Sequence, residues 1–255
     1  MIRTEVVDLL RADAATCARV RRDVLAVQQQ VYRSVEGCAE SAAQRVARYV
    51  DGMMDTARYH RFARVVLCYD GTRAVACGMG TAEVVTTAGR QVEVVRGGTN
   101  VVESHRAGGL VSTLTLRLVS AYLRRYAWSP HPRYYLGHCM SPVTYHVVAR
   151  RASNLHPSPT PCSPEIAETY AALVGHGPRP VREVVGSRVD ARTEAWLARS
   201  DSPHVRYFLS ANPRFRGGWA LPLLVRLDTE TFARSLHRSL CSRLRRWISV
   251  ARAWL

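Results

Sequence analysis

A strand, a glycine-containing loop and a helix follow one another without a gap between residues 101 and 119. Val101 and Val102 lead into Glu-Ser-His-Arg-Ala-Gly-Gly, and a helix with a repeating apolar face begins at Leu110. The N–H groups of such a first helical turn have no partner within the helix and lie at the positive end of its dipole. Glycine lets an anion approach this backbone closely. The junction therefore predicts a phosphate-binding loop, and the structural alternative is a tight strand-to-helix turn. The loop would be formed by Val101, Val102, Arg106, Gly108, Gly109, Leu110, Val111 and Ser112.

The segment before this junction has the pattern of antiparallel strands. Apolar runs at residues 64–69 and 73–80 flank Asp70-Gly71-Thr72, which is a strong signal for a β-hairpin. A turn at residues 87–90 then leads to a further strand at about 91–102. Gly97 and Gly98 inside that strand indicate a bulge or a close approach of another backbone.

In the sequence, a helical segment is expected before these strands, and two helices with a strand between them are expected after. Residues 5 to about 58 contain no proline and carry apolar residues near helical spacing, with breaks at Gly37 and Gly52. The helix after the junction extends to about Tyr126, and residues 133–139 form a strand. A second helix starts at Ser141-Pro142 and runs to about residue 152, because serine caps helices and proline fits the first helical position.

The C-terminal part is organised differently. Residues 154–190 form a proline-rich insert with one short helix at 165–174, and two final strands are expected at 205–209 and 218–225. Residues 229–255 read as a basic amphipathic helix. Its apolar face docks on the core in one interpretation and lies in a membrane interface in the other. The face consists of Phe232, Leu236, Leu240, Leu244, Trp247, Ile248, Ala251, Trp254 and Leu255.

The order of elements and the loop motif together resemble the GNAT superfamily of acyltransferases over residues 20–155. Its loop pattern is Arg/Gln-x-x-Gly-x-Gly/Ala, which Arg106 and Gly109 match, while Val111 stands where a small residue is usual. The layout is more similar to the branch that makes N-acyl amino acids and acyl-homoserine lactones than to small acetyltransferases. The resemblance implies an α+β fold with a mixed, mostly antiparallel sheet splayed around an acyl-thioester site and helices on both faces. It implies an acyltransferase domain at residues 1–228, followed by the helix at 229–255.

The resemblance also implies a site and its ligands. The donor would be acyl-CoA or an acidic acyl carrier protein, the acceptor a small amine, and no metal is expected. A backbone N–H near residues 99–102 would polarise the acyl carbonyl. Tyr145 would lie near the pantetheine sulfur, or would instead be an aromatic anchor for its helix. Glu103 is the first candidate for the general base, before Glu83, Glu93 and His105.

The charge of the chain leaves a second class of function open. All 36 basic residues are arginine and the formal net charge is +16, which favours anionic partners of several kinds. The alternative is therefore a non-catalytic basic module that binds anionic membrane or nucleic acid. Specific nucleic-acid recognition is not indicated, because no basic run alternates with aromatic residues and no zinc-finger spacing occurs.

Cysteine usage and hydropathy give the expected location. The seven cysteines are an odd number with no Cys-x-x-Cys pair, which predicts reduced thiols rather than disulfides or a zinc site. No apolar run reaches the roughly 18 residues of a transmembrane helix, and the first residues have no signal-peptide pattern. We therefore expect a cytoplasmic protein, with any membrane contact peripheral, at the inner membrane face through residues 229–255.

Overall fold

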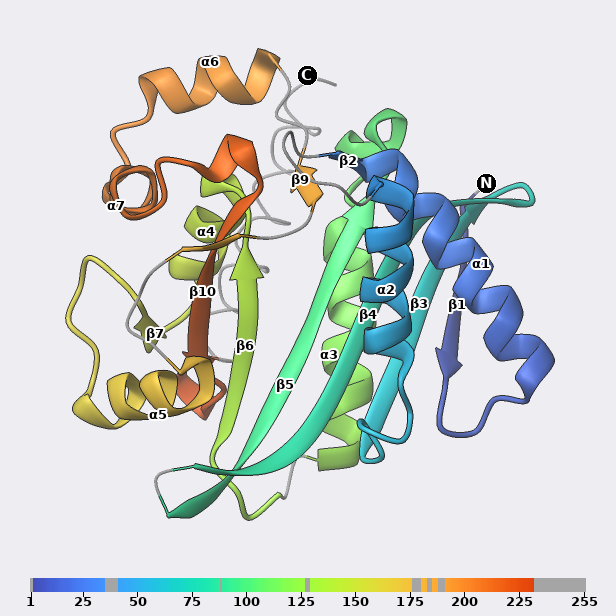
Figure 1. The fold of residues 1–255 in the computed structure, drawn as a ribbon, viewed down its shortest axis with the longest axis horizontal. Coiled ribbons are helices and arrows are strands. Elements are labelled where there is room, and N and C mark those ends of the chain that lie inside the picture. The colour runs from blue at the N-terminus through green and yellow to red at the C-terminus, as the bar shows by residue number, and fades with distance from the viewer. Residues whose placement is uncertain are drawn as a thin grey trace, which may run out of the picture.

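The computed structural model describes most of the 255-residue chain, namely residues 2–34, 41–87, 89–126, 129–175, 180–182, 185–187 and 191–231. Figure 1 shows the helices and strands formed by these residues. In chain order the elements are β1 (Ile2–Asp8), α1 (Ala14–Val31), β2 (Tyr32–Ser34), α2 (Ala42–Met54), β3 (Phe62–Asp70), β4 (Arg73–Thr87), β5 (Arg90–Val101), the 3₁₀ helix η1 (Glu103–Gly108), α3 (Leu110–Tyr126), β6 (Arg133–Cys139), α4 (Pro142–Ala149), β7 (Leu155–His156), α5 (Pro164–Val174), β8 (Val181–Arg182), β9 (Val185–Ser187), α6 (Ala191–Arg199), α7 (Pro203–Ala211), the 3₁₀ helix η2 (Phe215–Gly217) and β10 (Trp219–Arg226).

One large mixed sheet organises the molecule. Its strands lie in the order β1-β3-β4-β5-β6-β10-β7, and β8 also pairs with β10, while β2 and β9 form a separate small sheet. The pair β5–β6 is parallel and the remaining pairs of the described strands are antiparallel. The predicted α+β class with a mostly antiparallel sheet is therefore confirmed.

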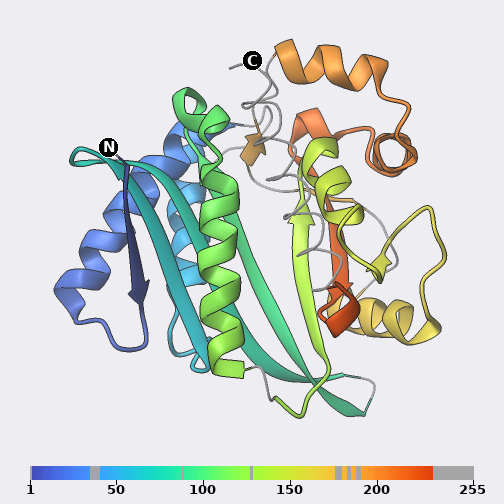
Figure 2. The same ribbon diagram turned by 180° about the vertical axis from the view of Figure 1, so that it is seen from behind.

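Helices cover both faces of the sheet. Helices α1 and α2 lie in front of β3 and β4 in Figure 1, and α3 lies on the opposite face, in front of the strands in Figure 2. Helix α1 begins where Asp13 accepts a hydrogen bond from the Thr16 N–H, and Ser41 and Gln44 form a capping box at the start of α2. The residues of α1 that face the sheet are spaced as one helical stripe, namely Val20, Val24, Val27 and Val31.

Several predicted local elements are confirmed by the structure. Strands β3 and β4 form the hairpin at Asp70-Gly71, and Gly71 adopts a positive φ of 59°. Helix α3 and strand β6 match their predicted ranges, and Ser141 caps α4 by accepting from the Val143 N–H. Each of these elements is specified by contacts within a few residues, which explains why the sequence pattern was sufficient.

The prediction of a helical segment over residues 5 to about 58 is wrong at its N-terminal end and at the break predicted for Gly52. Residues 2–8 are not helical but form β1, which pairs with β3 in antiparallel register, so that Val6 lies opposite Val66. The β-branched Ile2, Thr4, Val6 and Val7 suit this half-covered edge strand. Gly52 does not break a helix, since α2 continues through it to Met54, and Gly37 lies outside the described residues.

The predicted strand at residues 205–209 is also wrong, because these residues lie in α7. Pro203 occupies the first turn of α7, and the buried Val205 and Phe208 are three residues apart on one helical face. The second predicted strand is confirmed as β10. Of the predicted C-terminal helix, residues 232–255 lie outside the described part of the chain.

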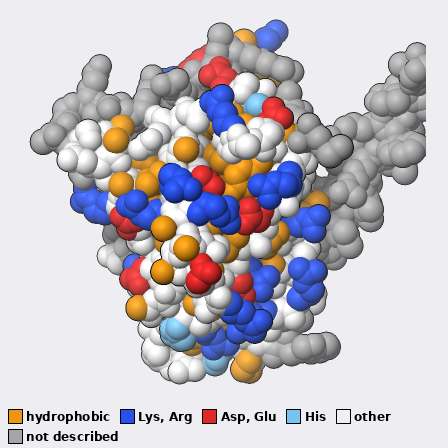
Figure 3. Space-filling model, turned by 90° about the vertical axis from the view of Figure 1, so that its right-hand side faces the viewer, with side chains coloured by type: hydrophobic (Ala, Val, Ile, Leu, Met, Phe, Trp, Pro, Cys, Tyr) orange, Lys and Arg blue, Asp and Glu red, His pale blue; other side chains and the backbone are white. Residues whose placement is uncertain are grey.

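Many arginines on the side formed by β1 and α1 are paired with acidic residues. Figure 3 shows this side, where blue basic side chains alternate with red acidic ones. Arg64 lies 3.0 Å from Asp8, and Arg21 holds Asp51 through two hydrogen bonds. Arg21 and its neighbours therefore do not form an unbroken basic patch on this side.

The described cysteines are free thiols. Cys68, Cys77 and Cys139 are buried free thiols, and Cys17 and Cys162 are partly exposed free thiols. None of the described helices has the length and apolar character needed to cross a membrane.

Candidate functional site: a wedge between two parallel strands

Strands β5 and β6 part shortly after they meet. Their parallel pairing covers residues 93–95 of β5 and 133–135 of β6, and it ends at the pair Val95 and Tyr135. Beyond this point both strands continue, to Val101 and Cys139, and Figure 1 shows them diverging. The backbones of the two strands thus diverge from an apex at Val95 and Tyr135, in the shape of a wedge. We refer to the region between them as the wedge.

The backbone of β5 presents alternate residues to the wedge. The N–H of Glu93 donates to Pro132 O at 2.9 Å, on the β6 side, whereas the N–H of Val102 donates to Val75 O, on the β4 side. Because the direction of backbone N–H and C=O groups alternates along a strand, residues 97, 99 and 101 face β6. These three residues lie where β6 has moved away, so their polar groups line the wedge. Two of them, 99 and 101, fall within the range predicted to polarise an acyl carbonyl.

The glycine pair in β5 marks a close approach rather than a bulge. Pairing of β4 with β5 keeps one register from Ala76 opposite Val101 to Thr87 opposite Arg90. A Cβ atom on Gly97 would lie 2.4 Å from Met79 O, whereas a Cβ on Gly98 would meet no atom within 4 Å. Gly97 is therefore required by the approach of the β4 backbone, and the strand is not interrupted as the sequence pattern suggested.

The predicted phosphate loop lies at the open end of the wedge. Val101 and Val102 are buried at the end of β5, and η1 connects them to Gly109, which adopts a left-handed φ of 72°. The N–H groups of Ser112 and Thr113 return to Gly109 O, so α3 starts here. Gly108 is the last residue of η1. The geometry provides the helix N-terminus that the sequence predicted, with Gly109 as its turning point.

The side chains of the loop differ in their placement. Leu110 is buried, whereas Val111 is 47% exposed and Ser112 is also exposed. The branched side chain of Val111, which stands where a small residue is usual, is therefore turned largely toward solvent. The Arg106 Nε lies 3.4 Å from Val101 O, so the guanidinium stem folds back over the end of β5.

Tyr145 lies in the core instead of facing the wedge. Its side chain is 0% exposed, its ring packs on Tyr207 and Phe208, and its hydroxyl donates to Pro157 O at 2.8 Å. Burial raises the pKa of Tyr145, so the hydroxyl keeps its proton at neutral pH. Of the two interpretations of this residue, the geometry favours the aromatic anchor.

The candidate bases occupy four different environments. Glu103 is exposed in η1 at the open end of the wedge. The His105 Nε2 lies 3.4 Å from Asp70, and Glu83 is 3.0 Å from Arg96. Glu93 is 0% exposed beside the paired foot of the strands. Among these, Glu103 combines solvent access with a position at the wedge.

A tyrosine that the sequence analysis did not single out spans the apex. Tyr135 of β6 donates a hydrogen bond to Gly97 O of β5 at 2.8 Å. Its ring lies over Gly137, where a Cβ atom would come within 2.7 Å of the ring. A tyrosine two residues before a glycine within one strand was the available signal, because residues i and i+2 share a face.

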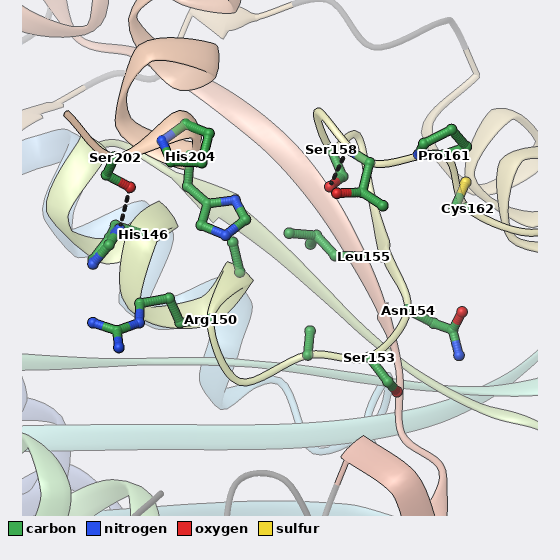
Figure 4. Close-up of a pocket in the computed structure, with 14 residues that line it drawn as sticks. His146, Arg150, Ser153, Asn154, Leu155, Ser158, Pro161, Cys162, Ser202 and His204 are labelled. Carbon is green, nitrogen blue, oxygen red and sulfur yellow. Dashed lines mark hydrogen bonds between the residues drawn. The ribbon is translucent and has the colours of Figure 1, made fainter. Parts of the chain in front are cut away.

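A cavity lies away from the wedge. It has a volume of about 450 Å³, and residues of α4, α7 and the segment between α4 and α5 line it, with none from β5 or β6 (Figure 4). His146 Nδ1 and Ser202 Oγ are 2.8 Å apart at its edge, while the Arg150 side chain points away from the centre. Burial, followed by the neighbouring Arg150 and His204, lowers the pKa of His146. Within the described ranges, no three His, Cys, Asp or Glu side chains are grouped so that they could hold a metal ion.

Comparison with known proteins finds similar structures but no similar sequence. No protein-family model and no curated protein matches this chain. The structure of yncA from Salmonella typhimurium with its cofactor acetyl-CoA matches with a TM-score of 0.42 and 12% identity, covering 89% of this chain and 95% of that one. A GNAT family acetyltransferase from Brucella melitensis in complex with acetyl-CoA matches with a TM-score of 0.34 and 13% identity, covering 52% and 75%.

A third match is a ribosomal-protein-alanine N-acetyltransferase from Brucella melitensis biovar Abortus 2308. Its TM-score is 0.32 at 13% identity, covering 51% of this chain and 76% of that one. Of these three, the Brucella melitensis protein in complex with acetyl-CoA is a GNAT family acetyltransferase.

Proposed function

We propose that this protein is an N-acyltransferase that moves an acyl group from acyl-CoA to an amine. The observation that carries the proposal is the parting of β5 from β6, which leaves the backbone of residues 97, 99 and 101 facing a wedge. The open end of this wedge leads directly to Gly109 and the start of α3. An extended ligand with a diphosphate at one end and amide groups along its arm has complementary chemistry.

The reaction needs only groups that such a wedge can supply. The amine attacks the thioester carbonyl carbon, a C–N bond forms and the C–S bond breaks, and CoA leaves as a thiolate. The amine gives up one proton to a base, and the thiolate takes up one proton from water, so the products are an amide and the free thiol of CoA. Backbone N–H groups on β5 would stabilise the negative charge that develops on the carbonyl oxygen. Glu103 is our candidate to accept the amine proton, directly or through water.

The net charge of the chain does not distinguish between the two candidate acyl donors. Coenzyme A and an acidic acyl carrier protein are both anionic, and both would be attracted to a chain of net charge +16. We favour acyl-CoA, because the loop at Gly109 offers a helix N-terminus for a diphosphate, which the phosphopantetheine of a carrier protein lacks.

The alternative function is a non-catalytic basic module for anionic membranes or nucleic acid. The net charge supports it in general terms, whereas the pairing of Arg64 with Asp8 and of Arg21 with Asp51 weakens it on one side of the molecule. It would predict binding of anionic vesicles or DNA without any stabilisation by acyl-CoA.

A pair of variants at Gly109 tests the proposal. Asn and Asp both tolerate a positive φ, so Gly109→Asn and Gly109→Asp should fold alike and differ by one negative charge. At a concentration of about 100 times its dissociation constant, acetyl-CoA should stabilise wild type by about 2.7 kcal/mol in a thermal unfolding assay. We expect Gly109→Asn to retain most of this stabilisation and Gly109→Asp to lose it. Equal acetyl-CoA affinity in the two variants, or none in wild type, would contradict the proposal.

A further inference from the structure

Tyr135 occupies the place where the two strands begin to part. It is the last residue of β6 that pairs with β5, and its hydroxyl reaches Gly97, two residues beyond the last paired residue of β5. The side chain thus reaches from β6 to β5 at the first residues beyond their last paired position. A ligand bound between the diverging strands would meet this ring at the apex.

The neighbouring glycines allow the ring to lie in this position. Tyr135, Gly137 and Cys139 share one face of β6, because alternate residues of a strand point to the same side. A Cβ on Gly137 would lie 2.7 Å from Cε1 and 2.9 Å from the hydroxyl of Tyr135. A side chain at 137 would therefore push the ring off β6. Gly137 lets the ring lie flat along its own strand and point toward β5.

The hydroxyl fixes the ring on the opposite strand. Gly97 is a residue whose C=O faces the wedge, and this oxygen accepts the hydrogen bond from Tyr135 at 2.8 Å. Burial raises the pKa of Tyr135, so its hydroxyl stays protonated and remains a donor. The ring is also packed against the cluster that contains Cys139 and Tyr145. Both ends of the side chain are therefore held.

The orientation of a bound donor follows from the loop. If the diphosphate lies at Gly109, beyond the end of β5, the pantetheine arm runs along β5 toward the apex. Five residues separate Gly97 from Val102, which corresponds to about 16 Å of strand at about 3.3 Å per residue. The acyl end of the donor then lies nearest to Tyr135.

We infer that Tyr135 closes the apex of the wedge and limits the donor to short acyl groups of acetyl size. The inference rests on the proposed function and specifies its substrate class. A longer acyl chain would have to displace the ring and break its hydrogen bond to Gly97 O. Removing the ring should open the apex to chains that wild type excludes.

The test compares kcat/KM for acetyl-CoA and hexanoyl-CoA in the full chain, with the same amine acceptor. We expect wild type to prefer acetyl-CoA. Tyr135→Ala should raise the hexanoyl-to-acetyl ratio by about tenfold or more, since steric differences of this size in a pocket change specificity by such factors. Tyr135→Phe keeps the ring but loses the hydrogen bond, and should raise the ratio by a smaller factor.

A matched control lies one residue earlier. Tyr134 points to the other face of β6, where its hydroxyl donates to Glu165 at 3.1 Å, so Tyr134→Phe should leave the ratio unchanged. An unchanged ratio in a folded Tyr135→Ala that still binds CoA would overturn the inference and leave the proposed function standing. If Tyr135→Ala does not fold, an unchanged ratio in Tyr135→Phe decides against it. Absence of CoA binding in wild type would overturn both proposals together.

Discussion

Tyrosine side chains at the wedge and beside it differ in what their hydroxyls bind. The Tyr135 hydroxyl reaches a carbonyl of the neighbouring strand inside the wedge, while the Tyr145 hydroxyl binds Pro157 O within the core of α4 and α7. Burial raises the pKa of both residues, so each acts as a hydrogen-bond donor at neutral pH. The two tyrosines therefore differ in position and not in protonation state: Tyr135 lies where it can meet substrate, and Tyr145 packs a helix.

Replacing Tyr145 by phenylalanine distinguishes its two interpretations. As an anchor, Tyr145→Phe should lower the free energy of unfolding by about 1–3 kcal/mol, because Pro157 O is left without its buried partner. Turnover should change by less than about threefold, whereas loss of a proton donor would lower kcat by about 100-fold or more. Urea unfolding and steady-state kinetics measure the two quantities. Tyr207→Phe, which keeps the ring stacked on Tyr145, is the control, and a stable Tyr145→Phe with a large loss of kcat would show a catalytic role.

Strand β5 is the element on which most features of the site depend. One side of it pairs with β4 in unbroken register along its length, which holds it straight. Its other side pairs with β6 over residues 93–95 and is then left facing the wedge. The same strand thus supplies one edge that is fully paired and another whose backbone groups no longer pair with β6. The sequence pattern predicted a bulge or a close backbone approach at Gly97 and Gly98, and the structure shows the close approach at Gly97.

Alanine substitutions at Gly97 and Gly98 of β5 should differ in their effect on the free energy of unfolding. Gly97→Ala places a methyl group 2.4 Å from Met79 O, so β4 and β5 must move apart, and we expect a loss of about 1–3 kcal/mol in unfolding free energy. Gly98→Ala meets no atom within 4 Å and should change stability by less than about 0.5 kcal/mol. Denaturant unfolding of both variants measures this difference. Equal effects at the two positions would contradict the close approach at Gly97.

The whole molecule combines a mixed sheet with a strongly positive charge. Helices cover both faces of the sheet, and β5 and β6 diverge toward the end of the sheet where η1 and the start of α3 lie (Figures 1 and 2). The net charge of +16 creates a field that favours approach of a multiply charged anion such as CoA. The net charge should raise the rate at which CoA associates with the protein, whereas the loop at Gly109 should stabilise CoA once it is bound.

Salt should therefore slow the association of acetyl-CoA. Between about 0.01 M and 1 M salt the screening length falls from about 30 Å to 3 Å, and we expect the association rate constant to fall by about tenfold or more. Stopped-flow measurements with acetyl-CoA give this rate constant. Acetyl-pantetheine, which has no phosphate, is the control and should show little dependence on salt. Equal dependence for the two ligands would show that the charge of the protein does not guide the donor.

Local sequence signals determined the parts of this protein that are built from neighbouring residues. The hairpin at Asp70-Gly71, the cap at Ser141 and the turn at Gly109 each depend on backbone preferences and hydrogen bonds within about four residues. For this reason the strand-loop-helix junction, and with it the candidate phosphate loop, could be read from the chain alone.

Tertiary structure decided the features that depend on partners far away in the sequence. β1 is a strand because β3, about 60 residues later, offers it an edge, and residues 203–211 form a helix because Val205 and Phe208 find a core on one side. The wedge exists because β5 and β6 pair for three residues and then separate, and Tyr135 reaches Gly97 across 38 residues of sequence. Such contacts depend on how distant segments pack, and no pattern within either segment contains that information.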